Sequence, residues 1–268
     1  MKLGISSYSF TWAVGAPGYL PPNPLSGTDL LNLAKSLGIS LVQIADNMPL
    51  HLMTEEKLGN LVIQARELNI EIEIGANKLT TSNLERHIQI AGMFNSKILR
   101  FVIDAPGYRP TTEEVIAIVA DAEPKLKHHN IILAIENHDR MFADDFVQIM
   151  EKVNSPFVGI CLDCANSLGV GEGFHEVVQK LAPHTVNFHL KEISIKRKYH
   201  MMGFDIEGKP FGEGSLPLEW MLEQLPPRCL TAILEQWTPP EANISLTMEK
   251  ELDWAKRSIA YLSKFMEK

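Results

Sequence analysis

Four side chains that are able to bind a metal ion stand at corresponding points of the sequence. Each of them ends a short apolar run rich in branched residues; they are Glu136, Asp163, His189 and Glu235. Three carboxylates brought together would repel one another and raise one another's pKa values, and a divalent cation removes that penalty. Oxygen-rich ligation with one imidazole favours Mn²⁺, Mg²⁺ or Co²⁺ over Zn²⁺. A fold that gathers these residues would therefore hold one divalent metal ion.

The elements that would gather them form a regular alternation of strand-like and helix-like segments. Predicted strands begin near residues 3, 41, 70, 97, 131, 157, 185 and 229, and predicted helices lie near 28–37, 54–68, 81–94, 111–128, 142–153, 172–182, 216–225 and 245–264. This alternation, with no antiparallel hairpin signal, predicts the α/β class and a single (β/α)8 TIM barrel over residues 1–268. In such a barrel the C-terminal ends of the strands form one rim, which carries the active site.

An open, doubly wound sheet is the alternative architecture for the same alternation. Such sheets bind dinucleotides through a Gly-x-Gly-x-x-Gly turn after the first strand, whereas Ser6-Ser7-Tyr8-Ser9 stands there in this chain. The helix boundaries carry their usual signals: Thr54 and Thr111 precede acidic first turns, and Gly38 follows the first helix. The sequence therefore favours the closed barrel.

Two charged residues fall inside predicted strands rather than at their ends. Glu73 lies in the third strand and Arg100 in the fourth. An ionised side chain inside a barrel must be paired, because burial without a partner is costly. Since the third and fourth strands are neighbours in a barrel, we expect Glu73 and Arg100 to pair with each other in its interior.

Composition excludes several classes of protein. The chain has 268 residues and a net charge of −8, whereas a general nucleic-acid binder needs a positive field. No apolar stretch is long enough to cross a membrane, and the N-terminal residues read as a strand, so we expect no signal peptide and a cytoplasmic location. The three cysteines do not form a disulfide scaffold, and the single pair Cys161 and Cys164 does not favour a thiolate zinc site.

The strand-end motifs resemble those of a known superfamily. The segments Ala134–His138, Cys161–Asn166 and Phe188–Glu192, together with Leu234-Glu235, look like the core motifs of the xylose isomerase-like TIM barrels, in particular the sugar phosphate isomerase/epimerase group. The resemblance runs through the whole chain in order. The superfamily also contains metal-dependent DNA-repair endonucleases, which the negative charge of this chain disfavours.

The resemblance implies roles for the four strand-end residues. It implies that Glu136, Asp163, His189 and Glu235 bind one divalent metal ion, and that Glu136 and Glu235 also serve as acid and base. We accordingly expect an isomerase or epimerase that acts on a ketose or a related sugar derivative. Its glutamates would transfer protons on either side of the sugar, through an enediolate that the cation stabilises.

Further residues near the strand ends are candidates for binding the substrate. They are Tyr8, Trp12, His138, Asn166, Lys191 and Arg197. Two positions depart from the better-known ketose epimerases of the group, which tend to carry His where this chain has Asn166 and Arg where it has Ile195. The long loop from Glu192 to Pro217 contains a basic triplet that includes Arg197, and we expect it to close over the site and grip a carboxylate or phosphate.

Two other functions remain open on the sequence alone. A metal-dependent decarboxylase of a sugar-derived 3-oxo acid would need the same cation, a basic residue such as Lys191 to orient the carboxylate, and only one proton donor. A barrel that binds a sugar or metal without turnover is the second alternative. In each case we expect the protein to bind a small sugar or sugar acid, and neither nucleic acid nor a membrane. The sequence is also compatible with a homo-oligomer.

Overall fold

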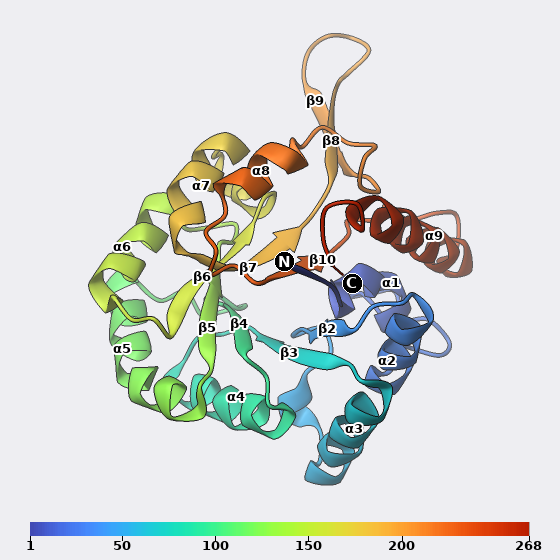
Figure 1. Cartoon of the computed structure of the whole chain (residues 1–268). Helices are drawn as coiled ribbons and strands as arrows, with labels where there is room; N and C mark the ends of the chain where they lie inside the picture. Colours follow the sequence, from blue (N-terminus) through green and yellow to red (C-terminus); the bar gives the residue numbers. More distant parts are fainter. Residues whose placement is uncertain (268) are drawn as a thin grey trace.

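The centre of the molecule is a closed barrel of parallel strands, as the computed structural model, which describes residues 1–267, makes plain (Figure 1). Around the barrel the strands follow the order β1-β10-β7-β6-β5-β4-β3-β2. Their bounds are β1 (Lys2–Ser6), β2 (Leu41–Ile44), β3 (Glu71–Ala76), β4 (Ile98–Val102), β5 (Ile132–Glu136), β6 (Val158–Asp163), β7 (Thr185–Leu190) and β10 (Thr231–Leu234). The predicted (β/α)8 barrel is confirmed.

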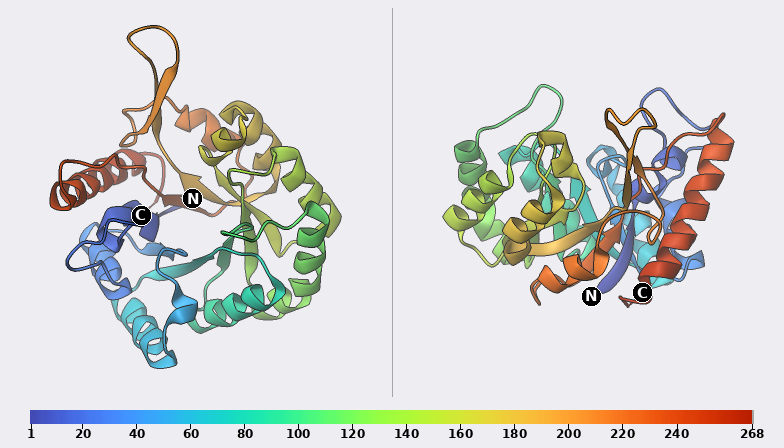
Figure 2. Two further views of the ribbon diagram at one scale, coloured as in Figure 1. Left: turned by 180° about the vertical axis from the view of Figure 1, so that it is seen from behind. Right: turned by 90° about the horizontal axis from the view of Figure 1, so that it is seen from above.

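Helices surround the barrel on its outside and cover the outward faces of the strands (Figures 1 and 2). Their bounds are α1 (Thr11–Val14), α2 (Gly27–Ser36), α3 (Glu55–Leu68), α4 (Thr81–Phe94), α5 (Thr112–His129), α6 (Ala143–Val153), α7 (Phe174–Leu181), α8 (Leu218–Gln224) and α9 (Ile244–Leu262). The large apolar cluster of the protein lies between the strands and these helices. Within the described part of the chain, no helix combines the length and the apolar character needed to cross a membrane.

Local sequence signals set the ends of several helices. The hydroxyl oxygens of Thr54 and Thr111 accept hydrogen bonds from the backbone N–H groups of Lys57 and Glu114. Both threonines are therefore the helix caps that the sequence predicts. Four helices in succession, α3 to α6, end at an asparagine in the left-handed conformation; these are Asn69, Asn95, Asn130 and Asn154. Asparagine tolerates this conformation better than most residues, so these caps stop each helix before its return strand.

The expected pairing of Glu73 with Arg100 is wrong, although both side chains are buried. The register of β3 and β4 aligns Arg100 with Gly75, so Glu73 lies one layer deeper in the barrel. Gly75 has no side chain, and a Cβ built there would lie only 2.9 Å from the Ala45 Cα and 3.5 Å from the Arg100 Cδ. Arg100 packs beside Gly75 and reaches the C-terminal rim, where it pairs with Glu136 and Asp46.

The loop between β7 and α8 contains an antiparallel hairpin that the sequence analysis missed. It consists of β8 (Ile193–Arg197) and β9 (Phe204–Gly208). The hairpin extends outward beyond the ring of helices (Figures 1 and 2), so in this structure it does not close over the barrel. Its signal was present as a two-residue alternation of apolar and polar side chains on both sides of Gly203.

Candidate metal centre and active site

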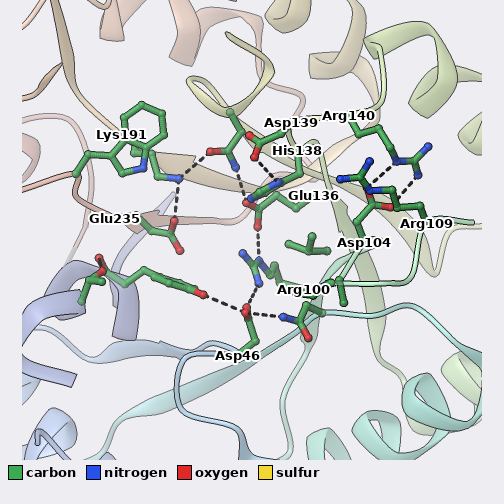
Figure 3. A pocket seen from close by; sticks show the side chains of 18 of the residues that line it. Asp46, Arg100, Asp104, Arg109, Glu136, His138, Asp139, Arg140, Lys191 and Glu235 are labelled. Atoms are coloured by element: carbon green, nitrogen blue, oxygen red, sulfur yellow. Dashed lines mark hydrogen bonds and ion pairs between the residues drawn. The ribbon is translucent and has the colours of Figure 1, made fainter. Parts of the chain in front are cut away.

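A cavity of about 600 Å³ opens at the C-terminal ends of the barrel strands. Its floor is formed by charged residues from β4, β5 and the segment after β10, and its outer wall by the loops that follow β4 and β5. Figure 3 shows its side chains pointing into a common space from several strands. The lining includes Tyr8, Asp46, Asn77, Arg100, Asp104, Arg109, Glu136, His138, Arg140, Asn166, Lys191, Glu235 and Trp237.

The four residues predicted to bind metal come together at the base of this cavity, where Glu136 and Glu235 line it and Asp163 and His189 lie buried beside them. The Nδ1 atom of His189 lies 3.4 Å from Oε2 of Glu136, 3.5 Å from Oε1 of Glu235 and 3.9 Å from Oδ2 of Asp163. All four side chains are buried. Neighbouring strands explain the arrangement, because β6 and β7 align Asp163 with His189 and β7 and β10 align His189 with Ile233, two residues before Glu235.

The cluster contains unpaired polar atoms and excess negative charge, both of which a bound divalent cation would compensate. Among the described residues, Nδ1 of His189 and Oε1 of Glu235 are buried and have no hydrogen-bond partner, which is rare for polar atoms in protein interiors. The carboxylates of the three candidate ligands and of Asp46 face two cations, Arg100 and Lys191. With His189 neutral, two negative charges are left uncompensated. The donor set therefore fits a divalent metal ion.

Cys161 also lies near this cluster, with its sulfur close to the ligand atoms of Glu136 and His189. Burial and the adjacent Glu136 raise the pKa of its thiol well above the usual range. The thiol donates instead to Oδ1 of Asn187, at 3.2 Å. A protonated thiol is a poor metal ligand, so Cys161 acts as a packing residue and the oxygen-rich set remains the candidate centre.

Asp163 is anchored so that one oxygen faces the site. Its Oδ1 atom accepts the backbone N–H groups of Ala165 and Asn166 at 2.8 and 2.9 Å. Its Oδ2 atom accepts a hydrogen bond from the ammonium group of Lys191 at 2.7 Å. The turn after β6 thus fixes the carboxylate and leaves Oδ2 toward the other candidate ligands.

Glu136 is held at both of its carboxylate oxygens. Oε2 accepts a hydrogen bond from Nε–H of Arg100, and Oε1 accepts one from the Nδ2 amide group of Asn166 at 2.8 Å. Arg100 also donates to Oδ1 of Asp46 at 2.6 Å. Burial alone would lower the pKa of Arg100, but Glu136 and Asp46 raise it well above its usual range. Arg100 therefore stays charged and keeps the Glu136 carboxylate in one orientation.

Lys191 lies between two of the candidate metal ligands. Its ammonium nitrogen lies 2.7 Å from Oδ2 of Asp163 and 3.2 Å from Oε2 of Glu235, and it also donates to Oδ1 of Asn166 at 3.1 Å. Burial would lower the pKa of Lys191, yet Asp163 and Glu235 raise it above its usual range. Burial likewise raises the pKa of Glu235, but His189 and Lys191 bring it well below the ordinary glutamate value.

Two arginines on the outer wall of the cavity were not identified from the sequence. Arg140 makes a two-point ion pair with Asp104, at 2.6 and 2.8 Å, and donates to the carbonyl oxygen of Pro110 at 3.0 Å. Arg109 is exposed at the mouth. Figure 3 shows both arginines on the same side of the cavity. Both follow the ends of β4 and β5 by a few residues, so reading past each strand end would have found them.

The predicted substrate-binding residues do not all reach the cavity. Tyr8 and His138 line it, as do Asn166 and Lys191. Tyr8 donates its hydroxyl to Oδ2 of Asp46 at 3.0 Å. Trp12 does not line the cavity, because its indole N–H donates to the carbonyl oxygen of Thr238 at 2.8 Å.

Arg197 lies on the outward hairpin, where it donates to the carbonyl oxygen of Met201 at 2.9 Å and stacks over Phe204. It is not among the residues that line the cavity. In this structure the basic groups on the cavity wall are therefore Arg109 and the Asp104-paired Arg140, rather than the basic triplet of the loop.

Comparisons with known proteins agree with this fold. The family model described as xylose isomerase-like TIM barrel matches residues 28–264. A curated relative, the 3-oxo-isoapionate decarboxylase of Pectobacterium atrosepticum, is 28% identical over 264 residues, covering 98% of this chain and 95% of the relative. The match to the relative spans nearly the whole barrel, and the family model covers it from α2 onward.

Two solved structures share the fold at low sequence identity. A xylose isomerase-like TIM barrel protein from Mycobacterium smegmatis, in complex with magnesium, superposes with a TM-score of 0.70 at 14% identity, covering 96% of this chain and 97% of that one. A D-psicose 3-epimerase solved in the presence of D-fructose gives a TM-score of 0.73 at 13% identity and full coverage of both chains.

Proposed function

The chain belongs to the xylose isomerase-like TIM barrel family, and from that premise we propose that it is a metal-dependent decarboxylase of a sugar-derived 3-oxo acid. From the sequence alone, an isomerase or epimerase was the favoured function and this lyase was the alternative. Two findings reverse the order. One is that both carboxylate oxygens of Glu136 accept hydrogen bonds from neighbouring side chains. The other is the sequence similarity, along nearly the whole chain, to a 3-oxo-isoapionate decarboxylase.

The observation that carries the proposal is that both carboxylate oxygens of Glu136 already accept a hydrogen bond, although each keeps a lone pair that a metal ion could use. Arg100 and Asn166 each donate to one of its two oxygens. An epimerase needs two proton carriers that act on opposite faces of the sugar. Glu136 could act as one of these carriers only by giving up its ion pair with the buried Arg100. Decarboxylation needs only one proton donor, and the remaining groups supply it.

The residues on the cavity floor and wall have distinct tasks in this reaction. A divalent cation held by Glu136, Asp163, His189 and Glu235 would polarise the 3-oxo group of the substrate. Arg109 and Arg140 contribute positive charge on the wall where the substrate carboxylate enters. As carbon dioxide leaves, the electron pair of the broken carbon–carbon bond passes onto the 3-oxo group. One proton must then be added to the carbon that lost the carboxylate.

We assign that proton to the pair formed by Lys191 and Glu235. The ammonium group of Lys191 lies 3.2 Å from Oε2 of Glu235 and is buried beside the cavity. Its raised pKa means that the proton is present throughout the neutral pH range. The carbon of an enolate is a strong enough base to accept it, and Glu235 stabilises the ammonium form that solvent restores.

Product analysis in deuterated buffer tests the proposal directly. The protein is supplied with Mn²⁺ and a panel of 3-oxo sugar acids and ketoses, and products are followed by NMR together with release of carbon dioxide. We expect carbon dioxide and one deuterium at the new C–H bond from a 3-oxo acid. Lys191→Met and Glu235→Gln should lose most activity, whereas Arg197→Met, a control outside the cavity, should retain it. Turnover of no 3-oxo acid, with deuterium exchange into a ketose, would refute the assignment.

One observation keeps an epimerase as the second candidate. The carboxylates of Glu136 and Glu235 lie at nearly equal distances from Nδ1 of His189, 3.4 and 3.5 Å, on strands that are not neighbours in the barrel. If substrate binding freed Glu136 from Arg100, the two glutamates would flank a sugar. An epimer that carries solvent deuterium, formed without carbon dioxide, would favour this function, and metal binding without turnover would favour a non-catalytic barrel.

A further inference from the structure

A chain of buried polar side chains continues below the candidate metal centre into the barrel interior. The Nε2 atom of His189 lies 2.9 Å from Oε1 of Gln43. The amide nitrogen of Gln43 donates to Oε2 of Glu73 at 3.1 Å and to Oδ1 of Asn187 at 3.3 Å. These four residues are almost completely buried. None of the proposed steps of the reaction uses Gln43, Glu73 or Asn187.

The contacts around Gln43 determine which way its amide points. Its nitrogen faces two acceptors, a carboxylate oxygen of Glu73 and the amide oxygen of Asn187. The orientation of Asn187 is set in turn, because its own nitrogen donates to Oε2 of Glu73 at 3.0 Å and to the Thr231 hydroxyl at 2.8 Å. Turning the Gln43 amide over would put its oxygen against both acceptors and lose both hydrogen bonds.

The fixed amide determines the form of His189. Because Oε1 of Gln43 can only accept, Nε2 of His189 must be the protonated nitrogen. In the neutral imidazole the unprotonated nitrogen is then Nδ1, which faces the three carboxylates and has no hydrogen-bond partner among the described residues. A metal-binding histidine typically donates its other N–H to such an acceptor, which fixes the ring and raises its basicity.

We propose that Gln43, held in place by Glu73, is a positioning residue that aims Nδ1 of His189 at the metal. The proposal rests on the proposed metal site and not on the reaction that takes place there. The register of the barrel explains why these residues meet, since β2 and β3 align Gln43 with Glu73. Asn187 stands two residues before His189 on β7, on the same face of the strand.

Two substitutions at the same buried position give opposite expectations. Gln43→Met has similar length but offers no acceptor, and we expect it to bind Mn²⁺ about 10–100-fold more weakly than the wild type. Gln43→Glu retains an acceptor for Nε2–H, and a proton shared with Glu73, whose pKa burial raises, replaces the lost amide N–H between the two carboxyl groups. We therefore expect this variant to bind Mn²⁺ at least as tightly. A general loss of barrel packing would weaken binding in both variants. Thr185→Val serves as a control, because Thr185 is buried on β7, the strand that carries His189, and its hydroxyl donates only to the Leu181 carbonyl.

Isothermal titration of the purified full-length proteins with Mn²⁺ measures the dissociation constants, and circular dichroism checks that each is folded. Equal affinity of Gln43→Met and the wild type would overturn the positioning role. If Gln43→Met does not fold, a more than tenfold loss in folded Gln43→Glu would overturn it instead. Failure of the wild type itself to bind Mn²⁺ is a separate outcome, which would contradict the metal site on which the inference rests.

Discussion

Binding of a divalent cation should stabilise the folded protein, because it satisfies groups that the fold leaves uncompensated. Two buried polar atoms, Nδ1 of His189 and Oε1 of Glu235, have no partner among the described residues, and two negative charges are in excess around them. A ligand that binds only the folded state adds about 2.7 kcal/mol at a concentration of 100 times its dissociation constant. For a chain of this size that corresponds to a rise of roughly 5–10 °C in the melting temperature.

Thermal melts with and without chelator measure this stabilisation. The protein is treated with EDTA, dialysed, and melted with Mn²⁺, Mg²⁺, Co²⁺ or Zn²⁺ at matched ionic strength. His189→Gln should abolish the rise in melting temperature. Glu251→Gln should retain it, because Glu251 is a buried carboxylate bonded to the backbone N–H groups of Trp12 and Ala13, away from the cluster. No rise with any of the four ions, or an equal rise in His189→Gln, would refute the reasoning.

Two further predictions concern the scaffold. Burial raises the pKa of Glu251 to about 8, so the folded state binds this proton more tightly than the unfolded state. The resulting stability is present below pH 4.5 and is lost as pH rises to 8, at up to about 1.4 kcal/mol per pH unit. Urea melts should therefore show Glu251→Gln gaining stability relative to the wild type from pH 5 to 8; a constant difference would argue against it. Gly75→Val should destabilise by about 1–3 kcal/mol and reduce Mn²⁺ affinity, since the new side chain would clash with Ala45 and crowd the adjacent Arg100; unchanged affinity in folded protein would contradict a role for Arg100 in positioning Glu136.

Much of the architecture follows from local sequence patterns. The alternation of apolar runs and amphipathic segments predicted each barrel strand and the helices α2 to α9, although not α1, because burial of a strand on both faces requires a continuous apolar run. The polar residue at the end of each run marked the rim where Glu136, Asp163, His189 and Glu235 gather. Helix caps such as Thr111 are local as well, since the cap and the N–H group that it accepts are only a few residues apart.

The pairing of the polar side chains was decided by the tertiary structure alone. Which carboxylate Arg100 meets depends on the stagger of β3 against β4, and neither strand encodes that stagger in its own pattern. The same dependence put Gln43 beneath His189, although the two residues are far apart in the sequence. The tertiary structure also determined that the hairpin of β8 and β9 extends away from the cavity. The residue types set which ligands and charges the chain possesses, whereas barrel closure determined which of them share a buried space and must neutralise one another.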